Sequence, residues 1–399
     1  MTTDLQSAEA VRVRCLEVCS RVTAGDGQAF TIDRSCLPAC ADRVAQVTLE
    51  RYPDLAIPLH ARWRHFVFDG VDRFTALAAQ FPDDPLERAR IMVDLVIPSV
   101  LLDAGAGSAW SYSDAQSGAR FARSEGLALA SLEAFAAGLF SLRTHQPWRC
   151  DGFKLSTLTD AMLAGAFQVR DDNPLNGMRG RAQVLRALGR AMHRDSDRFG
   201  VQGGRLGHLV DYLQRGPGKN GQLTASALLR EVLQALAPIW PKRAVNDHAP
   251  PGDIWRYPGL PGDGLVPFHK LSQWLSLSLI EPLALAGIEV SELNGLSALA
   301  EYRNGGLLID SRVLVANDPA LIGRTLAADD PAIVEWRALT VALFDELAPL
   351  VRDRLGLDAT ALPLPALLEG GTWAAGRQLA QDLRDGRPPI ELASDGSVF

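Results

Sequence analysis

The densest group of polar side chains in this chain is Glu301-Tyr302-Arg303-Asn304, which two glycines follow directly. Such a run packs poorly in a core and is typical of a loop that carries a site. Glu301 is a candidate general base or stabiliser of positive charge, and Arg303 is a candidate clamp for an anion. We expect Tyr302 and Asn304 to contact the same ligand.

Asp103 is a second candidate carboxylate, because it follows an apolar helical run and precedes the small residues 104–107. A carboxylate at the C-terminal end of a helix opposes the helix dipole, so Asp103 is predicted to be solvated or retained for function. The small residues let a ligand approach the backbone, and Trp110 is available for stacking. Ser124 and Glu125 fit ordinary capping of the next helix, and Glu125 is also a candidate acid.

Cationic and aromatic side chains alternate in Arg62-Trp63-Arg64-His65-Phe66. This combination can stack on a flat ligand and grip an anion. We therefore expect Trp63 to stack on the ligand and Arg64 or His65 to hold a phosphate. The structural alternative is a surface helical turn with one buried tryptophan.

A third group lies on one predicted helix, where Lys270 and Gln273 are three positions apart and share a face. A cation and an amide on one face can bind a phosphate-bearing ligand. Glu281 follows on the same helix and is a further candidate acid. An exposed polar stripe is the structural alternative.

Common cofactor and nucleophile motifs are missing: the sequence has no P-loop, no G-x-G-x-x-G and no G-x-S-x-G. Cys15 and Cys19 share their spacing with Cys36 and Cys40, but structural zinc sites more often use tighter pairs or Cys/His mixtures. We interpret these cysteines as small buried residues, with a zinc site as the alternative. We expect a site without a metal or an organic cofactor.

Composition limits the classes of partner. The 399 residues include 40 basic and 47 acidic side chains, for a net charge of -7, whereas nucleic-acid binding needs a basic face. The sequence has no apolar run of about eighteen residues and no apolar core of a secretory signal. We expect a cytoplasmic protein that binds a small molecule, with no nucleic acid and no membrane as partner; the oligomeric state stays open.

Helical periodicity dominates the chain and predicts a mostly α fold, a single large helical domain with small β-hairpin elements. Helices are predicted over residues 5–22, 35–50, 87–104, 123–142, 156–167, 177–193, 204–214, 223–238, 268–286, 331–355 and 372–384. An extended piece is expected at 29–33 and a hairpin at 306–315. We divide the chain into an N-terminal helical segment, 1–60, and a catalytic domain, 61–399, in which the Pro/Gly-rich stretch 243–266 is a candidate lid.

Seven blocks of the sequence resemble an uncharacterised-domain family that is associated with the uracil catabolism pathway proceeding through ribosylurea. The blocks are Arg62–Phe66, Leu101–Trp110, Arg123–Ala130, Phe268–Trp274, Glu301–Gly306, Ile333–Ala342 and Leu368–Arg377. They occur in one order, and the resemblance runs from about residue 50 to the C-terminus.

The chain also resembles the queuosine 5′-phosphate N-glycosylase family, an all-α fold related to helix-hairpin-helix DNA glycosylases. The similar patterns are an Asp-containing turn before a tryptophan (103–110), F-x-K-x-x-Q-x-L (268–275) and an acidic-Tyr-Arg triplet (301–303). That family has Asp where this chain has Glu301, and an Asp on the Lys/Gln helix where this chain has Ser278 or Glu281. The resemblance implies a glycosylase-like helical core and N-glycosidic chemistry.

Together these features imply hydrolysis of the N-ribosidic bond in ribosylurea or its 5′-phosphate, with release of urea. Such cleavage passes through an oxocarbenium-like sugar cation, which a nearby carboxylate stabilises. We assign that role to Glu301 with Asp103 as its partner, and the protonation of urea to Glu125 or Glu281. The alternatives are an amidohydrolase acting on the ureido group, a phosphoribosyl-transferring enzyme, and a non-catalytic nucleotide-binding or scaffold protein of pyrimidine catabolism.

Overall fold

The computed structural model describes residues 4–68, 70–201, 203–241, 252–393 and 396, and the prediction of a mostly α fold is confirmed. Within these residues, the strands form six sheets of two strands each. The chain divides into two compact units, each assembled from separated stretches. The first comprises Met1–His60, Ala244–Gln273 and Glu292–Ala393, and the second comprises Ala61–Arg243, Trp274–Ser291 and Ser394–Phe399. The boundary at residue 60 between a helical segment and a catalytic domain stays a prediction, as does the glycosylase-like core.

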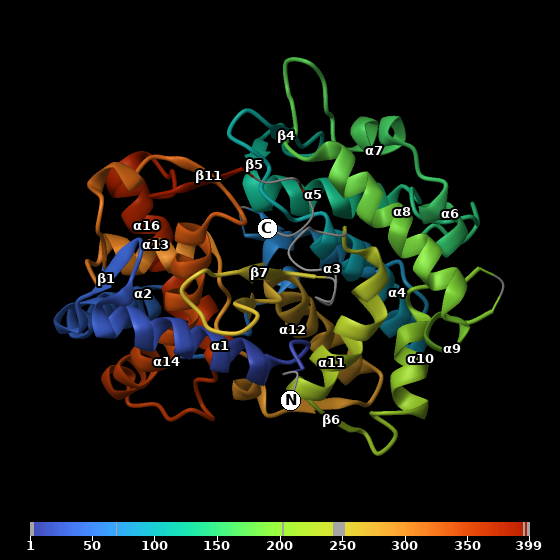
Figure 1. Cartoon of the computed structure of the whole chain (residues 1–399). Helices are drawn as coiled ribbons and strands as arrows, with labels where there is room; N and C mark the ends of the chain where they lie inside the picture. Colours follow the sequence, from blue (N-terminus) through green and yellow to red (C-terminus); the bar gives the residue numbers. More distant parts are fainter. Residues whose placement is uncertain (1–3, 69, 202, 242–251, 394–395, 397–399) are drawn as a thin grey trace. The chain divides into compact units, whose positions relative to one another are not determined.

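The first unit packs N-terminal helices against helices from its last segment, which ends at Ala393. Its helices α1 (Ala8–Arg21) and α2 (Leu37–Arg51) pack against α14 (Pro331–Leu355), as Figure 1 shows in blue and red. Helix α13 (Tyr302–Asp310) packs on α16 (Trp373–Arg384). This approach requires a glycine, because a Cβ at Gly376 would lie 2.2 Å from the backbone oxygen of Arg303.

Short elements complete the first unit. They are the π-helices Val22–Asp26 and Leu368–Thr372, the 3-10 helices Arg34–Cys36, Leu293–Gly295 and Pro319–Leu321, and α15 (Leu364–Leu367). The strand pairs are β1 (Phe30–Ile32) with β10 (Leu314–Ala316), β7 (Ile254–Arg256) with β8 (Leu265–Pro267), and β11 (Thr325–Ala327) with β12 (Glu391–Ala393). The last pair is parallel and the other two are antiparallel.

The second unit is built around the apolar helix α4 (Pro85–Leu101), which contacts α5 (Arg123–Ala136), α8 (Met178–Arg194) and α10 (His208–Arg215). Asp84 caps α4 by accepting a hydrogen bond from the backbone N–H of Leu86. Twelve of the seventeen residues of α4 are buried, so this helix needs polar partners wherever it carries a charged side chain. Its buried Asp94 has such a partner in Arg205, at 2.6 Å.

The other elements of the second unit are shorter or more peripheral. They are 3-10 helices Arg62–Phe66 and Ala237–Ile239, α3 (Arg73–Ala78), α6 (Gly152–Ser156), α7 (Asp160–Ala166), α9 (Ser196–Phe199) and α11 (Ala225–Leu236). The strand pairs are β2 (Val67–Phe68) with β3 (Val71–Asp72), β4 (Ser111–Ser113) with β5 (Arg120–Ala122), and β6 (Gln222–Thr224) with β9 (Glu289–Ser291). Helix α12 (Lys270–Leu285) contributes 270–273 to the first unit and 274–285 to the second.

The predicted hairpin at 306–315 is wrong. Helix α13 runs to Asp310, and β10 pairs with β1 from the predicted extended piece at 29–33, so that Phe30 lies opposite Ala316. The reason is that Glu301 caps a helix through its carboxylate, and buried Leu307 and Leu308 lie on the inner face of that helix. Periodicity over so short a stretch cannot separate a helix from a strand.

The candidate lid at 243–266 is described only in part, because residues 242–251 lie outside the described residues. From Asp253 onward the segment forms the β7–β8 hairpin. Trp255 and Tyr257 are buried, as their aromatic character predicts for a packed segment. A lid function stays a prediction.

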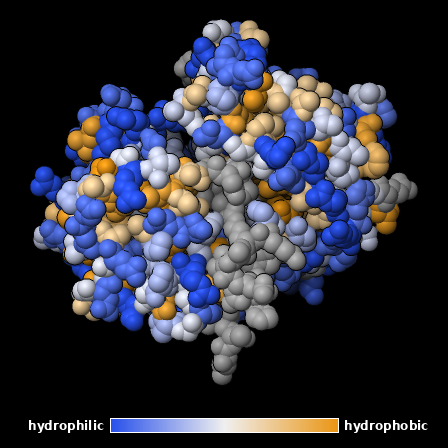
Figure 2. Space-filling view, turned by 45° about the horizontal axis from the view of Figure 1, so that its top comes forward, coloured by the Kyte–Doolittle hydropathy of each residue, from blue (hydrophilic) through white to orange (hydrophobic). Residues whose placement is uncertain are grey.

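Hydrophilic residues cover much of the face drawn in Figure 2, and hydrophobic residues appear there in separated groups. This mixture is ordinary for a folded protein surface. Among the described residues, no helix has the length and apolar character required to cross a membrane.

Candidate functional site

Asp103 lies in a buried polar cluster of the second unit, directly after the end of α4. Its carboxylate accepts a hydrogen bond of 2.5 Å from Nη1 of Arg62, and the two side chains are 5% and 0% exposed. The Arg62 Nε donates to Ser99 Oγ at 2.7 Å, and Ser99 in turn lies 2.6 Å from Ser131 Oγ. Burial lowers the pKa of Arg62, and the charges of Asp103 and Glu125 act in the opposite direction.

Asp103 is predicted to be either solvated or retained for function, and neither prediction includes Arg62 as its partner. A buried guanidinium compensates the carboxylate at the unfavourable end of the helix dipole. The signal was present in the sequence, since Ser99 and Ser131 are polar residues within apolar helical runs. Ligand binding is predicted for Trp63, Arg64 and His65, the neighbours of Arg62, whereas Arg62 itself is fully buried in the 3-10 turn.

A second arginine holds the backbone around Asp103. Arg181 on α8 is fully buried and donates to the carbonyl oxygens of Leu102, Ala104 and Gly105, the last two at 3.0 and 2.8 Å. Burial lowers the pKa of Arg181 to about 10. The turn that carries Asp103 is therefore fixed through its backbone as well as through the carboxylate.

Ser124 does not cap α5, contrary to the prediction, because the N-cap position is Ala122. Its hydroxyl instead donates to Asp103 Oδ1 at 2.9 Å. Arg123, which lies between Ala122 and Ser124, adopts a left-handed φ of 55°. This conformation is uncommon outside glycine and concentrates at functional sites. Glu125 lies in the first turn of α5, as predicted.

The aromatic candidates are buried and hydrogen-bonded. Trp63 donates from Nε1 to the backbone oxygen of Ser278 at 2.8 Å, and Trp110 donates to that of Phe167 at 3.0 Å. Trp63 is 4% exposed and Trp110 is 1% exposed. Their stacking on a ligand stays a prediction.

Arg64 and His65 differ from Arg62 in their surroundings. Arg64 pairs with Glu281 at 2.6 Å, and the two side chains are 32% and 45% exposed. His65 meets the Trp274 ring edge-on with the ring centroids 5.4 Å apart. Partial burial raises the pKa of Glu281, which Arg64 partly offsets.

Glu301 lies in the first unit as the N-cap of α13, so the predicted site loop is in fact a loop end and the first turn of a helix. Its carboxylate accepts from the backbone N–H groups of Arg303 at 2.8 Å and Asn304 at 2.5 Å. Burial raises the pKa of Glu301, and those two hydrogen bonds and the charge of Lys270 act against this rise. A carboxyl with a raised pKa is suited to proton exchange closer to neutral pH.

The neighbours of Glu301 are arranged around the same turn. Arg303 is 3% exposed, with its guanidinium 4.9 Å from the centre of the Tyr302 ring and its buried Nε without a hydrogen-bond partner. Asn304 donates to the backbone oxygen of Leu299 and accepts from Thr372 Oγ1 at 3.1 Å. Tyr302 is 40% exposed, so it is the most accessible member of this group.

Gln273 is fully buried, so it is not part of an exposed polar stripe on its helix. Its amide donates to Phe268 O at 3.0 Å and Ser297 Oγ at 2.8 Å, and it accepts from Ser297 N at 2.9 Å. The N–H of Lys270 donates to Asp253. His269, directly before α12, adopts a left-handed φ of 49°. Arg123 has the same kind of backbone conformation at the start of α5.

Two further buried carboxylates of the first unit, Asp253 and Glu369, are held by cationic side chains. Asp253 forms a pair of 2.8 Å bonds with Arg337, and this contact lowers the pKa of Asp253 to about 2 despite the opposing effect of burial. Glu369 accepts from Arg51 at 2.9 Å and lies 2.8 Å from Nδ1 of His60. Each pair joins residues far apart in the chain, so no spacing pattern reveals it.

The structure brings Asp103, Ser124 and Arg62 together in the second unit, and Glu301 with Arg303 and Asn304 in the first. Convergence of Asp103 and Glu301 on one ligand stays a prediction. The described residues contain no group of three or more side chains suited to hold a metal ion. Cys15, Cys19, Cys40 and Cys150 are buried, and burial raises the pKa of each thiol.

Residues 4–399 match the family described as "Protein of unknown function (DUF1688)". "Protein urg3" of Schizosaccharomyces pombe is 37% identical over 404 residues, which cover 99% of this chain and 98% of that protein. "Uracil catabolism protein 4" of Lachancea kluyveri is 38% identical over 434 residues, with the same two coverages of 99% and 98%. The resemblance to an uncharacterised-domain family is thereby confirmed, and the chain belongs to the DUF1688 family.

Proposed function

We propose that this protein acts in uracil catabolism as a hydrolase that cleaves the N-ribosidic bond of ribosylurea or its 5′-phosphate. The observation that carries the proposal is the similarity, over 99% of the chain, to a Lachancea kluyveri protein named for uracil catabolism. The resemblances to a ribosylurea-pathway family and to N-glycosylases supply the reaction. The carboxylates of Asp103 and Glu301, each held by hydrogen bonds, are groups that suit this reaction.

In the proposed reaction the bond between the ribose anomeric carbon and the urea nitrogen breaks, and its electron pair leaves with the nitrogen. Water adds its hydroxyl to the anomeric carbon, and a proton passes to urea. Positive charge develops on the sugar ring. Asp103 stabilises that charge, because Arg62 and Ser124 fix its carboxylate in one orientation and a preorganised charge needs no rearrangement during the reaction.

Glu301 takes the proton from the attacking water. Its raised pKa supports this role, since a general base works best with a pKa near the operating pH. The two backbone N–H groups at the start of α13 hold the carboxylate in place. Glu125 or Glu281 protonates the leaving urea, and Lys270 and Arg303 hold the phosphate when the substrate carries one.

The test is urea release from ribosylurea and from its 5′-phosphate by the purified full chain. We expect Asp103→Asn and Glu301→Gln each to lower kcat/KM by about 100-fold or more, the usual range for a lost acid–base group. Asp172→Asn is the matched control, because Asp172 has a 78% exposed side chain on the second unit, and it should leave the rate unchanged. Circular dichroism of each variant separates loss of activity from loss of fold.

Two outcomes would contradict the proposal at different levels. If the wild-type protein consumes neither substrate, the N-ribosidic hydrolase assignment is wrong. If urea is released but the folded Asp103→Asn and Glu301→Gln variants keep full activity, the reaction stands and the residue roles are wrong.

A further inference from the structure

A cavity of about 460 Å³ lies in the second unit, away from the Asp103 cluster. It is walled by α4, the segment around 142–153, the residues Gly200, Val201, Gly203 and Gly204, and α10. Five of its lining residues are arginines: Arg90, Arg143, Arg149, Arg205 and Arg215. A volume in this range is typical of small-molecule sites.

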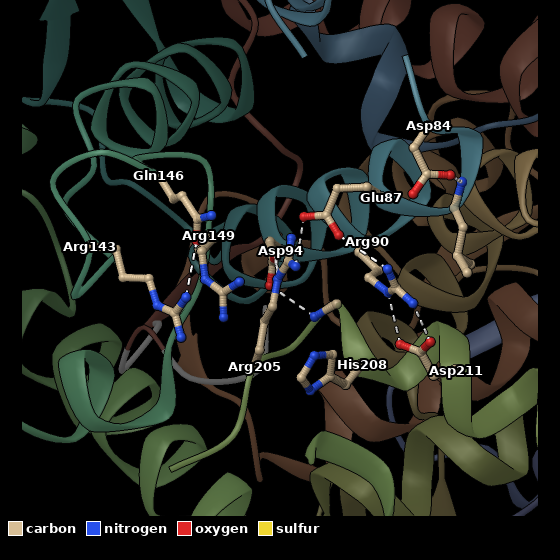
Figure 3. A network of polar contacts seen from close by, with 12 residues as sticks. Asp84, Glu87, Arg90, Asp94, Arg143, Gln146, Arg149, Arg205, His208 and Asp211 are labelled. Carbon is tan, nitrogen blue, oxygen red and sulfur yellow. Dashed lines mark hydrogen bonds and ion pairs between the residues drawn. The ribbon is translucent and has the colours of Figure 1, made fainter. Parts of the chain in front are cut away.

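Arg205 lines this cavity and has one unused donor. Its side chain is 3% exposed, its Nε contacts Asp94 at 2.6 Å, and its Nη1 contacts Glu87 at 2.8 Å (Figure 3). The buried Nη2 has no hydrogen-bond partner. A guanidinium offers its donors in a rigid fork, so the two carboxylates fix the direction of the remaining one.

Two neighbouring arginines are only loosely bound. Arg149 reaches Asp151 through contacts of 3.2 and 3.3 Å. Arg143 donates to the Gln146 side chain at 3.3 Å (Figure 3). These distances are longer than those of strong charge-assisted hydrogen bonds. Arg149 is close enough to act electrostatically on buried Asp94, which places its charge near Arg205.

Arg90 is different, because it is already engaged. It contacts Asp211 at 2.9 and 2.5 Å and Glu87 at 3.2 Å. The cavity therefore has one wall of closed ion pairs and another wall whose donors are unfilled or weakly filled. An anion is the ligand that completes such a set of donors.

Three lining residues of the cavity are apolar and exposed. Leu142, Phe153 and Val201 are 51%, 53% and 75% exposed, and all three line the cavity. Exposed large apolar side chains beside a polar pocket are typical of a site for an organic molecule. The open ring of Phe153 can stack on a flat group.

We propose that this cavity binds a phosphomonoester that carries a flat or apolar organic group. Its phosphate accepts from Arg205 Nη2, Arg149 and Arg143, and its organic group packs on Phe153. The site is separate from Asp103, because Arg90 lines the cavity and lies eleven positions before the end of α4 at Leu101, about 16 Å at a helical rise of about 1.5 Å per residue. The proposal does not depend on the proposed reaction.

The test is isothermal titration of the full chain with phenyl phosphate, inorganic phosphate and phenol. We expect phenyl phosphate to bind more tightly than inorganic phosphate, and phenol not to bind. Arg149→Gln should weaken phenyl phosphate binding about tenfold or more, the value of one charge-assisted contact. Phe153→Ala should weaken it about threefold while leaving inorganic phosphate binding unchanged.

Controls keep the test specific. Both substitutions leave the buried pair of Arg205 and Asp94 in place, so the fold should persist, and the melting temperature checks this. Arg170→Gln removes an equal charge from a side chain that is 65% exposed on the same unit and does not line the cavity; it should bind phenyl phosphate like the wild type.

The proposal is overturned if phenyl phosphate shows no saturable binding. It is also overturned if binding survives in Arg149→Gln, or is lost equally in Arg170→Gln, because the anion then responds to charge elsewhere. Equal affinities for inorganic and phenyl phosphate would refute the assignment of an organic ligand. Loss of binding in Asp103→Asn alone would place the ligand at the other cluster.

Discussion

Replacing Arg62 with methionine tests how strongly the Asp103 turn depends on a buried charge. The substitution keeps an unbranched apolar stem and removes the guanidinium that contacts Asp103 and Ser99. Because the two charged side chains are 0% and 5% exposed, water cannot replace the lost partner. Breaking such a pair costs about 3–5 kcal/mol, and we expect a loss of this size in the free energy of unfolding.

The assay is urea-induced unfolding followed by circular dichroism and tryptophan fluorescence. Arg64→Met is the matched control, because Arg64 lies in the same turn and its pair with Glu281 is partly exposed; it should cost less than about 1 kcal/mol. Adding Asp103→Asn to Arg62→Met should recover stability, since the double variant no longer buries an unpaired charge. A loss below about 1 kcal/mol for Arg62→Met, or strictly additive effects in the double-mutant cycle, would refute the buried-pair argument.

Three further expectations concern pH and packing. The pKa of Asp253 falls from 3.8 to about 2 on folding, so its pairing with Arg337 adds stability at neutral pH that is lost as the pH falls from about 4 to about 2. In Arg337→Met, the free energy of unfolding measured against pH should lose this slope between about pH 4 and about pH 2. Gly376→Ala should lower the free energy of unfolding by about 1–3 kcal/mol, because the added Cβ would lie 2.2 Å from a backbone oxygen. The control Gly165→Ala places its Cβ in open space and should raise the free energy of unfolding by about 0.5–1 kcal/mol. If Glu301 is the general base, kcat/KM should fall toward acid through a pKa above its ordinary 4.5, and a profile without that limb would exclude Glu301 from this role.

Long periodic segments were predicted well from the sequence. The helix predicted at 331–355 is observed as Pro331–Leu355, and the one at 177–193 as Met178–Arg194. Short segments were predicted less well, as at 306–315, where a capping carboxylate outside the stretch decides between helix and strand. Helix ends were also imprecise: α5 ends at Ala136, before the predicted limit at 142.

Asp103 and Glu301 stand out in the sequence, but the groups that hold them do not. Asp103 stands out because it lies at the unfavourable end of a helix dipole, and Glu301 because it opens a run of polar residues. The partner of Asp103 is Arg62, 41 positions earlier in the chain, and the cavity arginines come from several elements. Spacing rules act over one or two turns of a helix, so they carry no information on contacts of this range.

The amino-acid sequence alone determined the helical class of this protein, most of its helices and its family, because apolar periodicity and matching blocks are local properties of the chain. Tertiary structure alone decided which charges are buried together: Arg62 with Asp103, Arg337 with Asp253, and Arg205 with Asp94. The physical reason is that a buried charge is tolerated only beside a compensating group. Which group arrives there depends on the packing of helices that are distant in sequence.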